Sequence, residues 1–93
     1  DENVVAFDDI NPVAPVHVLI VPRKHIKDIS ALEDGDEKYM ISITKAIKEV
    51  ARIKGVLESG FRIINNCGID AGQTVMHLHF HLIGGKSLGE KII

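Results

Sequence analysis

The fold is decided by the segment His77–Ile83, which reads HLHFHLI. Histidines alternate strictly with large apolar residues, and this alternation is the pattern of a β-strand whose two faces meet different surroundings. Leu78, Phe80 and Leu82 are predicted to face the core, and the three histidines are predicted to share the opposite face. A slip of one residue would bury the imidazoles and expose the apolar side chains, so the pattern also fixes the register of the strand.

Other segments carry strand patterns as well. Val4–Phe7 is a short apolar run, and Phe61–Asn65 alternates apolar and polar residues. Val16–Val21 is β-branched and apolar except for His17, which predicts a central strand buried on both faces. The final strand is expected over Val75–Ile83. These four segments predict a mostly antiparallel sheet, which we expect to contain about five strands.

One long helix is predicted, beginning at Glu37. From there apolar residues recur at helical spacing on one stripe, formed by Met40, Ile43, Ile47, Val50 and Ala51. Asp34 or Asp36 is placed to cap its N-terminus, and Gly55 stands where a left-handed residue ends a helix. A short helical turn is also expected within His25–Leu32. One dominant helix on one face of a mostly antiparallel sheet is an α+β fold.

Composition limits the classes of protein to which the chain can belong. Its 93 residues suffice for one compact domain with one core. A formal net charge of -2 gives no basic face for long nucleic acid, so any nucleotide ligand is expected to be small. No stretch approaches the ~20 apolar residues of a membrane span. Cys67 is the only cysteine and cannot form an internal disulfide, which favours a reducing compartment, the cytoplasm.

Three interpretations of the histidine row compete. A chance polar face of a half-exposed strand would normally mix threonine, lysine, glutamate and serine. A metal site is disfavoured because His77 and His81 would lie roughly 13 Å apart along a strand. Nucleophilic catalysis needs one neutral imidazole to attack an electrophile, while neighbouring imidazoles, which titrate near ~6.5, handle protons and charge. Only this third interpretation uses all three histidines.

The sequence resembles the histidine-triad (HIT) superfamily, whose signature alternates three histidines with hydrophobic residues. Beside His77–Ile83, three blocks stand in family order: AFDDINP at Ala6–Pro12, HVLIVPRKHI at His17–Ile26 and GQTV at Gly72–Val75. The continuation Gly84–Lys86 is similar to the Hint-like branch, the histidine triad nucleotide-binding proteins that act as nucleoside phosphoramidases. A third histidine, rather than glutamine, argues against the nucleotidyltransferase branch. The resemblance covers nearly the whole chain and implies a HIT-like fold.

This resemblance implies a hydrolase that releases a nucleoside monophosphate, AMP or GMP, from a phosphoramidate or a related leaving group. His79 would be the nucleophile that forms a nucleotidyl-histidine, which water then resolves. His81 would contact the phosphate and leaving group, while His77 and His17 would orient the nucleophile through a hydrogen-bonded relay. A dinucleoside polyphosphate hydrolase and a non-catalytic nucleotide- or zinc-binding scaffold are the alternatives.

The resemblance also implies a set of nucleotide contacts. Asp9 would accept hydrogen bonds from the ribose hydroxyls, although an aspartate at this position can equally cap a turn before Asn11-Pro12. The pocket for the base would be lined by Phe7, Ile10 and Leu19. The alternative role for these apolar residues is ordinary core packing. The phosphate would be held by the loop before the last strand, through Asn66, Gly72, Gln73 and Thr74.

No cofactor is implied, and no metal ligand is assigned within this chain. The resemblance implies that residues 1–93 form a single HIT domain that starts after the family's N-terminal helix and first strand. Some bacterial members carry a Cys-x-x-Cys pair in that preceding segment, which binds zinc with histidines that resemble His25 and His77. Zinc is therefore expected only if a preceding segment supplies ligands. Relatives form homodimers, and one is expected here, because a wide apolar helix stripe and unprotected strand edges gain from burial in a partner.

Overall fold

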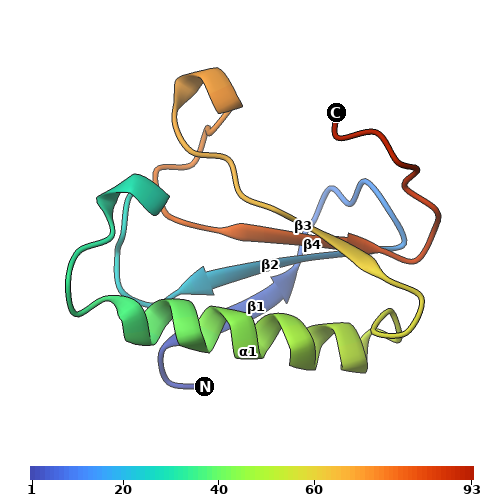
Figure 1. Ribbon diagram of the computed structural model, residues 1–93, viewed down its shortest axis with the longest axis horizontal. Coiled ribbons are helices and arrows are strands. Elements are labelled where there is room, and N and C mark those ends of the chain that lie inside the picture. The colour runs from blue at the N-terminus through green and yellow to red at the C-terminus, as the bar shows by residue number, and fades with distance from the viewer.

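The computed structural model describes residues 1–93, whose strands form one antiparallel sheet in the order β1-β2-β4-β3 (Figure 1). The strands are β1 (Val4–Asp8), β2 (Val16–Pro22), β3 (Phe61–Ile64) and β4 (Phe80–Gly84). The α-helix α1 (Glu37–Ile53) lies across one face of this sheet, and two short 3-10 turns, η1 (Ile29–Ala31) and η2 (Ile69–Ala71), lie in the connections. The predicted α+β fold is confirmed, but the sheet has four strands where about five are predicted. No helix of this fold is both long and apolar enough for a membrane crossing.

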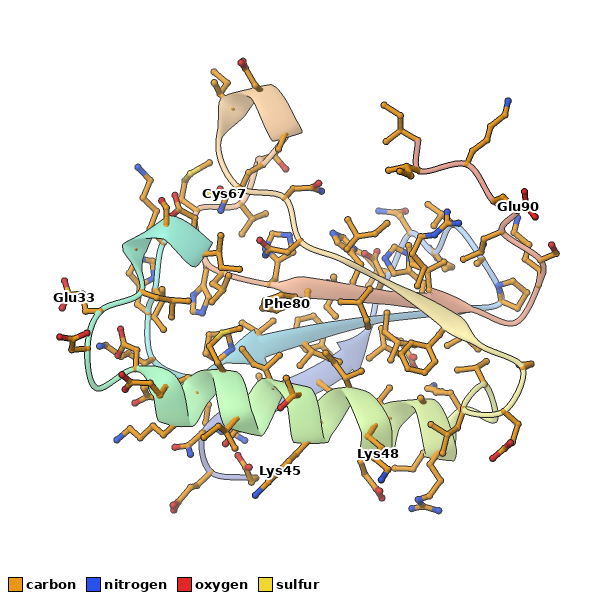
Figure 2. The ribbon with its side chains drawn as sticks, viewed as in Figure 1. Glu33, Lys45, Lys48, Cys67, Phe80 and Glu90 are labelled. Carbon is orange, nitrogen blue, oxygen red and sulfur yellow. The ribbon has the colours of Figure 1, made fainter.

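β2 is the strand on which both the core and the site are built. It pairs with β1 on one side and β4 on the other, as its apolar, β-branched sequence predicts. Val18 and Ile20 are buried in the core beneath α1, together with Phe80 of β4 (Figure 2). The alternate residues Leu19 and Val21 are only half-buried, because no helix covers the other face of the sheet. The central strand is therefore confirmed, but one of its faces stays open.

α1 packs on the sheet through the predicted stripe. Ile43 and Ala51 are buried in the core, and Met40, Ile47 and Val50 pack against it. The outer side of the helix carries the charged residues, as the helical spacing of its apolar residues requires.

The two ends of α1 differ in how well they match the prediction. Asp36 occupies the N-cap position, but its carboxylate makes no capping hydrogen bond. Its oxygens accept hydrogen bonds from Lys24 Nζ at 2.6 Å and from Glu33 N at 3.0 Å instead. The Lys24 bond, and then the Glu33 bond, lower the pKa of the Asp36 carboxyl. At the other end Gly55 has a φ of +75°, so the predicted left-handed residue is confirmed.

The last strand begins at Phe80, not at Val75 as the alternation predicts. The ladder between β2 and β4 ends at the pair Ile20–Phe80, and Pro22, two residues further along β2, has no N–H with which to extend it. On the β3 side, the side chain of Asn65 takes over and donates to the main-chain oxygen of His79 at 2.8 Å. The segment before Phe80 is thus held by individual hydrogen bonds rather than by a continuous ladder.

Candidate active site

A cavity of about 770 Å³ opens on the face of the sheet that α1 leaves uncovered. It is lined by eleven of the predicted site residues, namely Phe7, Asp9, His17, Leu19, Asn66, Gly72, Gln73, Thr74, His77, His79 and His81. The predicted catalytic histidines thus meet around one space, together with all but one of the predicted nucleotide contacts. The three histidines of the row face this cavity even though β4 itself begins only at Phe80.

Ile10 is the predicted contact that lies elsewhere. Its side chain is 91% exposed and does not line the cavity. The chain turns here, because the carboxylate of Asp9 accepts the N–H of Asn11 at 2.8 Å. The lining residues that were not predicted are Asn11, Val13, Val21 and Val75. Alternation along β2 is a signal that could have found Val21, whereas the turn after β1 carries no comparable pattern.

His79 has one ring nitrogen fixed and one free. Its Nδ1 lies 2.7 Å from the main-chain oxygen of His77, and since a carbonyl only accepts, Nδ1 carries the proton of the neutral ring. Nε2 then keeps its lone pair, and no group of the chain bonds to it. A neutral imidazole with an accessible lone pair is the form that acts as a nucleophile.

The ring of His77 points away from His79. Its Nε2 donates to the main-chain oxygen of Pro22 at 2.9 Å, and its Nδ1 lies 3.4 Å from Nδ1 of His25. His77 therefore contacts His79 through its main chain and not through its ring. His25 and His77 are the pair expected to bind zinc with added ligands, and this chain brings no third ligand residue to them.

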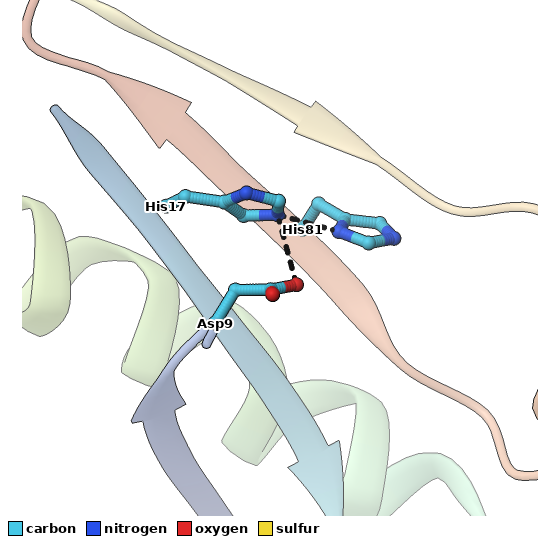
Figure 3. Close-up of side chains that lie close together, drawn as sticks. All are labelled: Asp9, His17 and His81. Atoms are coloured by element: carbon cyan, nitrogen blue, oxygen red, sulfur yellow. Dashed lines mark hydrogen bonds and ion pairs between the residues drawn. The ribbon is translucent and has the colours of Figure 1, made fainter. Parts of the chain in front are cut away.

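His17, His81 and Asp9 converge from β2, β4 and the end of β1 (Figure 3). Nε2 of His17 lies 2.9 Å from Nδ1 of His81 and 3.5 Å from Oδ2 of Asp9. His17 is buried, and its Nδ1 accepts a hydrogen bond from Val13 N at 3.2 Å. His17 is therefore hydrogen-bonded to His81 and not to His79, the predicted nucleophile. The centroids of the His79 and His81 rings lie 5.2 Å apart.

The environment of His81 favours its neutral form. Burial lowers the pKa of this imidazole, the nearby rings of His79 and His17 lower it further, and Asp9 opposes the shift. A neutral imidazole donates through one nitrogen and accepts through the other. The ring of His81 is thus suited to hydrogen bonding in the cavity without carrying a positive charge.

The loop before β4 is held by the side chain of Gln73, which is buried. Its Oε1 accepts the N–H of Gly68 at 2.8 Å, and its Nε2 donates to Lys27 O at 2.9 Å and Val75 O at 3.0 Å. These bonds use the polar atoms of Gln73, so its side chain shapes the loop instead of reaching a ligand. Gly72, with a φ of +84°, adopts a left-handed conformation that only glycine takes readily.

Two predicted phosphate contacts remain available in this loop. The side chains of Asn66 and Thr74 line the cavity and make no hydrogen bond within the chain. An amide and a hydroxyl are both able to donate to an anionic oxygen. The loop therefore offers two side-chain donors beside the histidines.

Asp9, His17 and His81 form the one cluster whose ligand atoms lie within 4.8 Å of one another, as a metal ion requires. A histidine that binds a metal through one ring nitrogen normally donates a hydrogen bond through the other. The other nitrogen of His17 faces the N–H of Val13, which is itself a donor. The cluster therefore does not fit a metal ion without breaking that bond.

Comparison with known proteins gives a consistent result. The HIT domain family model matches residues 1–88. The chain is 43% identical over 89 residues to an uncharacterized HIT-like protein of Chlamydia muridarum, covering 96% of this chain and 70% of that protein. It is similar to the structure of a HIT family hydrolase from Clostridium thermocellum, with a TM-score of 0.96, 50% identity, and 100% and 81% of the two chains covered.

A more distant structure is that of a histidine triad nucleotide-binding protein from Candida albicans. It matches with a TM-score of 0.80 and 26% identity over 98% of this chain and 72% of that chain. The motif blocks, the sheet with its single helix and the histidine-lined cavity agree with these matches, and the chain belongs to the HIT domain family.

Proposed function

We propose that this chain is a hydrolase that cleaves a nucleoside monophosphate, AMP or GMP, from a phosphoramidate or a related leaving group. The observation that carries the proposal is the state of His79, whose Nδ1 is held by the His77 carbonyl at 2.7 Å while Nε2 stays free at the cavity. The similarity to a HIT family hydrolase and to a histidine triad nucleotide-binding protein supports the same reaction class.

The reaction proceeds in two displacements at phosphorus. Nε2 of His79 attacks the α-phosphorus, and the bond to the leaving amine breaks, so that the amine departs with the electron pair and takes up one proton. Water then attacks the nucleotidyl-histidine, the bond between phosphorus and Nε2 breaks, and its electron pair returns to the ring. This water loses one proton, which balances the proton taken by the amine.

The remaining cavity residues bind the nucleotide. His81 donates a hydrogen bond to a phosphate oxygen or to the leaving group, and the side chains of Asn66 and Thr74 add two further donors. Asp9 accepts from the ribose hydroxyls. The half-buried Leu19 and the exposed Phe7 give the cavity an apolar side for the base.

The test is a search for the covalent intermediate. The protein is mixed with AMP linked to an aromatic amine, quenched in base within the first turnover, and digested for mass spectrometry. The expected result is an adenylyl group on the peptide that contains His79. Quenching in base matters, because a phosphorus–nitrogen bond to histidine survives alkali better than acid.

Matched variants sharpen this test. His79→Ala is expected to lower kcat by about 10⁴-fold or more and to abolish the adduct. His25→Ala, which removes an exposed histidine outside the cavity, is the control. It is expected to keep the kcat of the unmodified protein and to form the adduct. Full activity of His79→Ala, or an adduct on another residue, would overturn the proposal. Faster cleavage of dinucleoside polyphosphates than of phosphoramidates would replace the substrate class while keeping the mechanism.

We also propose that the working form is a homodimer. β1 is an edge strand of the sheet, and its Val5, which does not line the cavity, is 37% exposed. Apolar side chains at an unpaired edge are stabilised when a second copy covers them. Size-exclusion chromatography with light scattering at micromolar concentration is expected to give twice the chain mass, and a monomer under these conditions would contradict the proposal.

A further inference from the structure

The hydrogen bond between Val13 and His17 determines where the proton of the His17 ring lies. Val13 N is 3.2 Å from Nδ1 of His17. A main-chain N–H can only donate, so Nδ1 must accept. A neutral imidazole carries one proton, and in His17 that proton is therefore on Nε2.

The tautomer of His17 in turn determines that of His81. The Nε2–H of His17 faces Nδ1 of His81 at 2.9 Å and Oδ2 of Asp9 at 3.5 Å. Because the nearer contact is to His81, its Nδ1 accepts this hydrogen bond, and the proton of its own neutral ring is on Nε2. His81 then presents an N–H to the cavity, whereas the opposite tautomer would present a lone pair.

We propose that the main-chain N–H of Val13 is a positioning group for the reaction, which fixes the tautomers of His17 and His81 so that His81 donates to the substrate phosphate. This inference rests on the proposed function of the site. A lone pair on His81 would repel an anionic phosphate oxygen, so the wrong tautomer removes a donor and adds a repulsion. The side chain of Val13 is 62% exposed, and it is the main chain that has this role.

The turn that carries Val13 is built to hold its amide in place. Asp9 ties the turn on both sides, since its N donates to His17 O at 2.9 Å and its Oδ1 accepts from Asn11 N at 2.8 Å. Pro12 and Pro15 flank the amide and restrict the backbone on either side of it. A short, tied turn keeps the Val13 N–H directed at the ring of His17.

The test removes this one N–H. Val13→Pro has no main-chain donor, and Val13→Ala is the matched control, because it loses the valine side chain but keeps the donor. Ala14→Pro places a proline at the next position of the same turn, where the N–H makes no hydrogen bond within the chain. Correlation of ring nitrogens and protons by NMR in the ligand-free protein, at a pH where the rings are neutral, reads both tautomers directly.

The expected result has a spectroscopic and a kinetic part. The unmodified protein, Val13→Ala and Ala14→Pro show the proton on Nε2 of both His17 and His81. Val13→Pro shows mixed tautomers at both rings, and its kcat falls on the order of 10- to 100-fold below that of Val13→Ala. The ratio to Val13→Ala, measured with the amine-linked AMP, removes the effect of the lost side chain.

Three outcomes would overturn the inference. The first is a His17 proton on Nδ1 in the unmodified protein, which needs no variant that could fail to fold. The second is Val13→Pro with unchanged tautomers, and the third is changed tautomers with the kcat of Val13→Ala. Failure of the proposed function is distinguished from these outcomes, because it shows as a missing adduct on His79 while the NMR tautomers stay as stated.

Discussion

The main-chain oxygen of His77 accepts a 2.7 Å hydrogen bond from Nδ1 of His79, while the ring of His77 bonds to Pro22 instead. The orientation of the free Nε2 is therefore set by the backbone just before β4. This backbone is itself held by the side chain of Asn65, which donates to the oxygen of His79 at 2.8 Å. The carbonyls of His77 and His79, two residues apart, thus have separate roles: the first orients the ring of His79 and the second holds the backbone.

Removing the ring of His77 is expected to cost far less activity than removing that of His79. His77→Ala loses the hydrogen bond to Pro22 but keeps the carbonyl that orients the nucleophile. A single hydrogen bond contributes about 1 kcal/mol, which corresponds to about a 5- to 10-fold lower kcat. Steady-state kinetics with the amine-linked AMP checks this. A loss as large as that of His79→Ala would mean that the ring itself takes part in the chemistry.

The position of the histidine row could be predicted from sequence, but the hydrogen bonds of its rings could not. Alternation along a chain fixes which face a side chain occupies, and His77, His79 and His81 do line one cavity. The extent of the strand depends on its neighbours, and Pro22 of the adjacent strand β2 cannot donate to extend the ladder beyond the pair Ile20–Phe80. The residues around the histidines do not show where the ladder ends, so the predicted strand begins too early, at Val75 instead of Phe80.

Replacing Gln73 by leucine is expected to loosen the loop before β4. Gln73→Leu leaves the N–H of Gly68 and the oxygens of Lys27 and Val75 without their partner. A buried polar group without a partner costs about 1–3 kcal/mol, so the free energy of unfolding falls by at least about that amount. The KM for the nucleotide rises as well, because the same loop carries Thr74.

Urea denaturation and steady-state kinetics on the same variant check both parts. Asp70→Asn is the control, because Asp70 lies in the same loop but is exposed and makes no hydrogen bond with its side chain. A Gln73→Leu protein as stable as this control would show that the three bonds contribute nothing net.

Two isoleucines of α1 provide a matched test of the core. Ile43 is 1% exposed beneath the sheet, whereas Ile41 is 55% exposed on the other side of the helix. Ile43→Ala is expected to lower the free energy of unfolding by about 2–5 kcal/mol, because it leaves a cavity in a packed core. Ile41→Ala is expected to change it by no more than about 0.5 kcal/mol. Equal effects in urea denaturation would contradict the packing of α1 described above.

The contacts made by the turn after β1 could not be predicted from sequence. The sequence predicts a ribose contact or a turn cap for Asp9; in the structure its carboxylate accepts the N–H of Asn11 and also lies beside His17. The contact of Val13 with His17 joins a main-chain amide to a ring four residues away. Main-chain contacts of this kind leave no trace in residue type, so neither the hydrogen bond nor the exposure of Ile10 could be predicted.

The lowered pKa of His81 gives the stability of the protein a defined pH dependence. Burial, followed by the rings of His79 and His17, causes this shift, while the imidazole in the unfolded chain titrates near about 6.5. Between the lowered pKa and about 6.5 the unfolded state binds more protons than the folded state, so stability increases with pH in that window. The contribution is complete above about 6.5 and is lost as the pH falls through the folded-state pKa of His81.

Removing the imidazole of His81 is therefore expected to flatten this dependence. The free energy of unfolding is measured by urea denaturation at about pH 7.5 and about pH 5, and the difference between the two is smaller in His81→Asn than in the unmodified protein. His25→Asn, which removes an exposed histidine, keeps the larger difference. A loss of stability on acidification that is as large or larger in His81→Asn would contradict the lowered pKa of His81. A larger loss is expected only if the removed ring binds protons more tightly in the folded state than in the unfolded state.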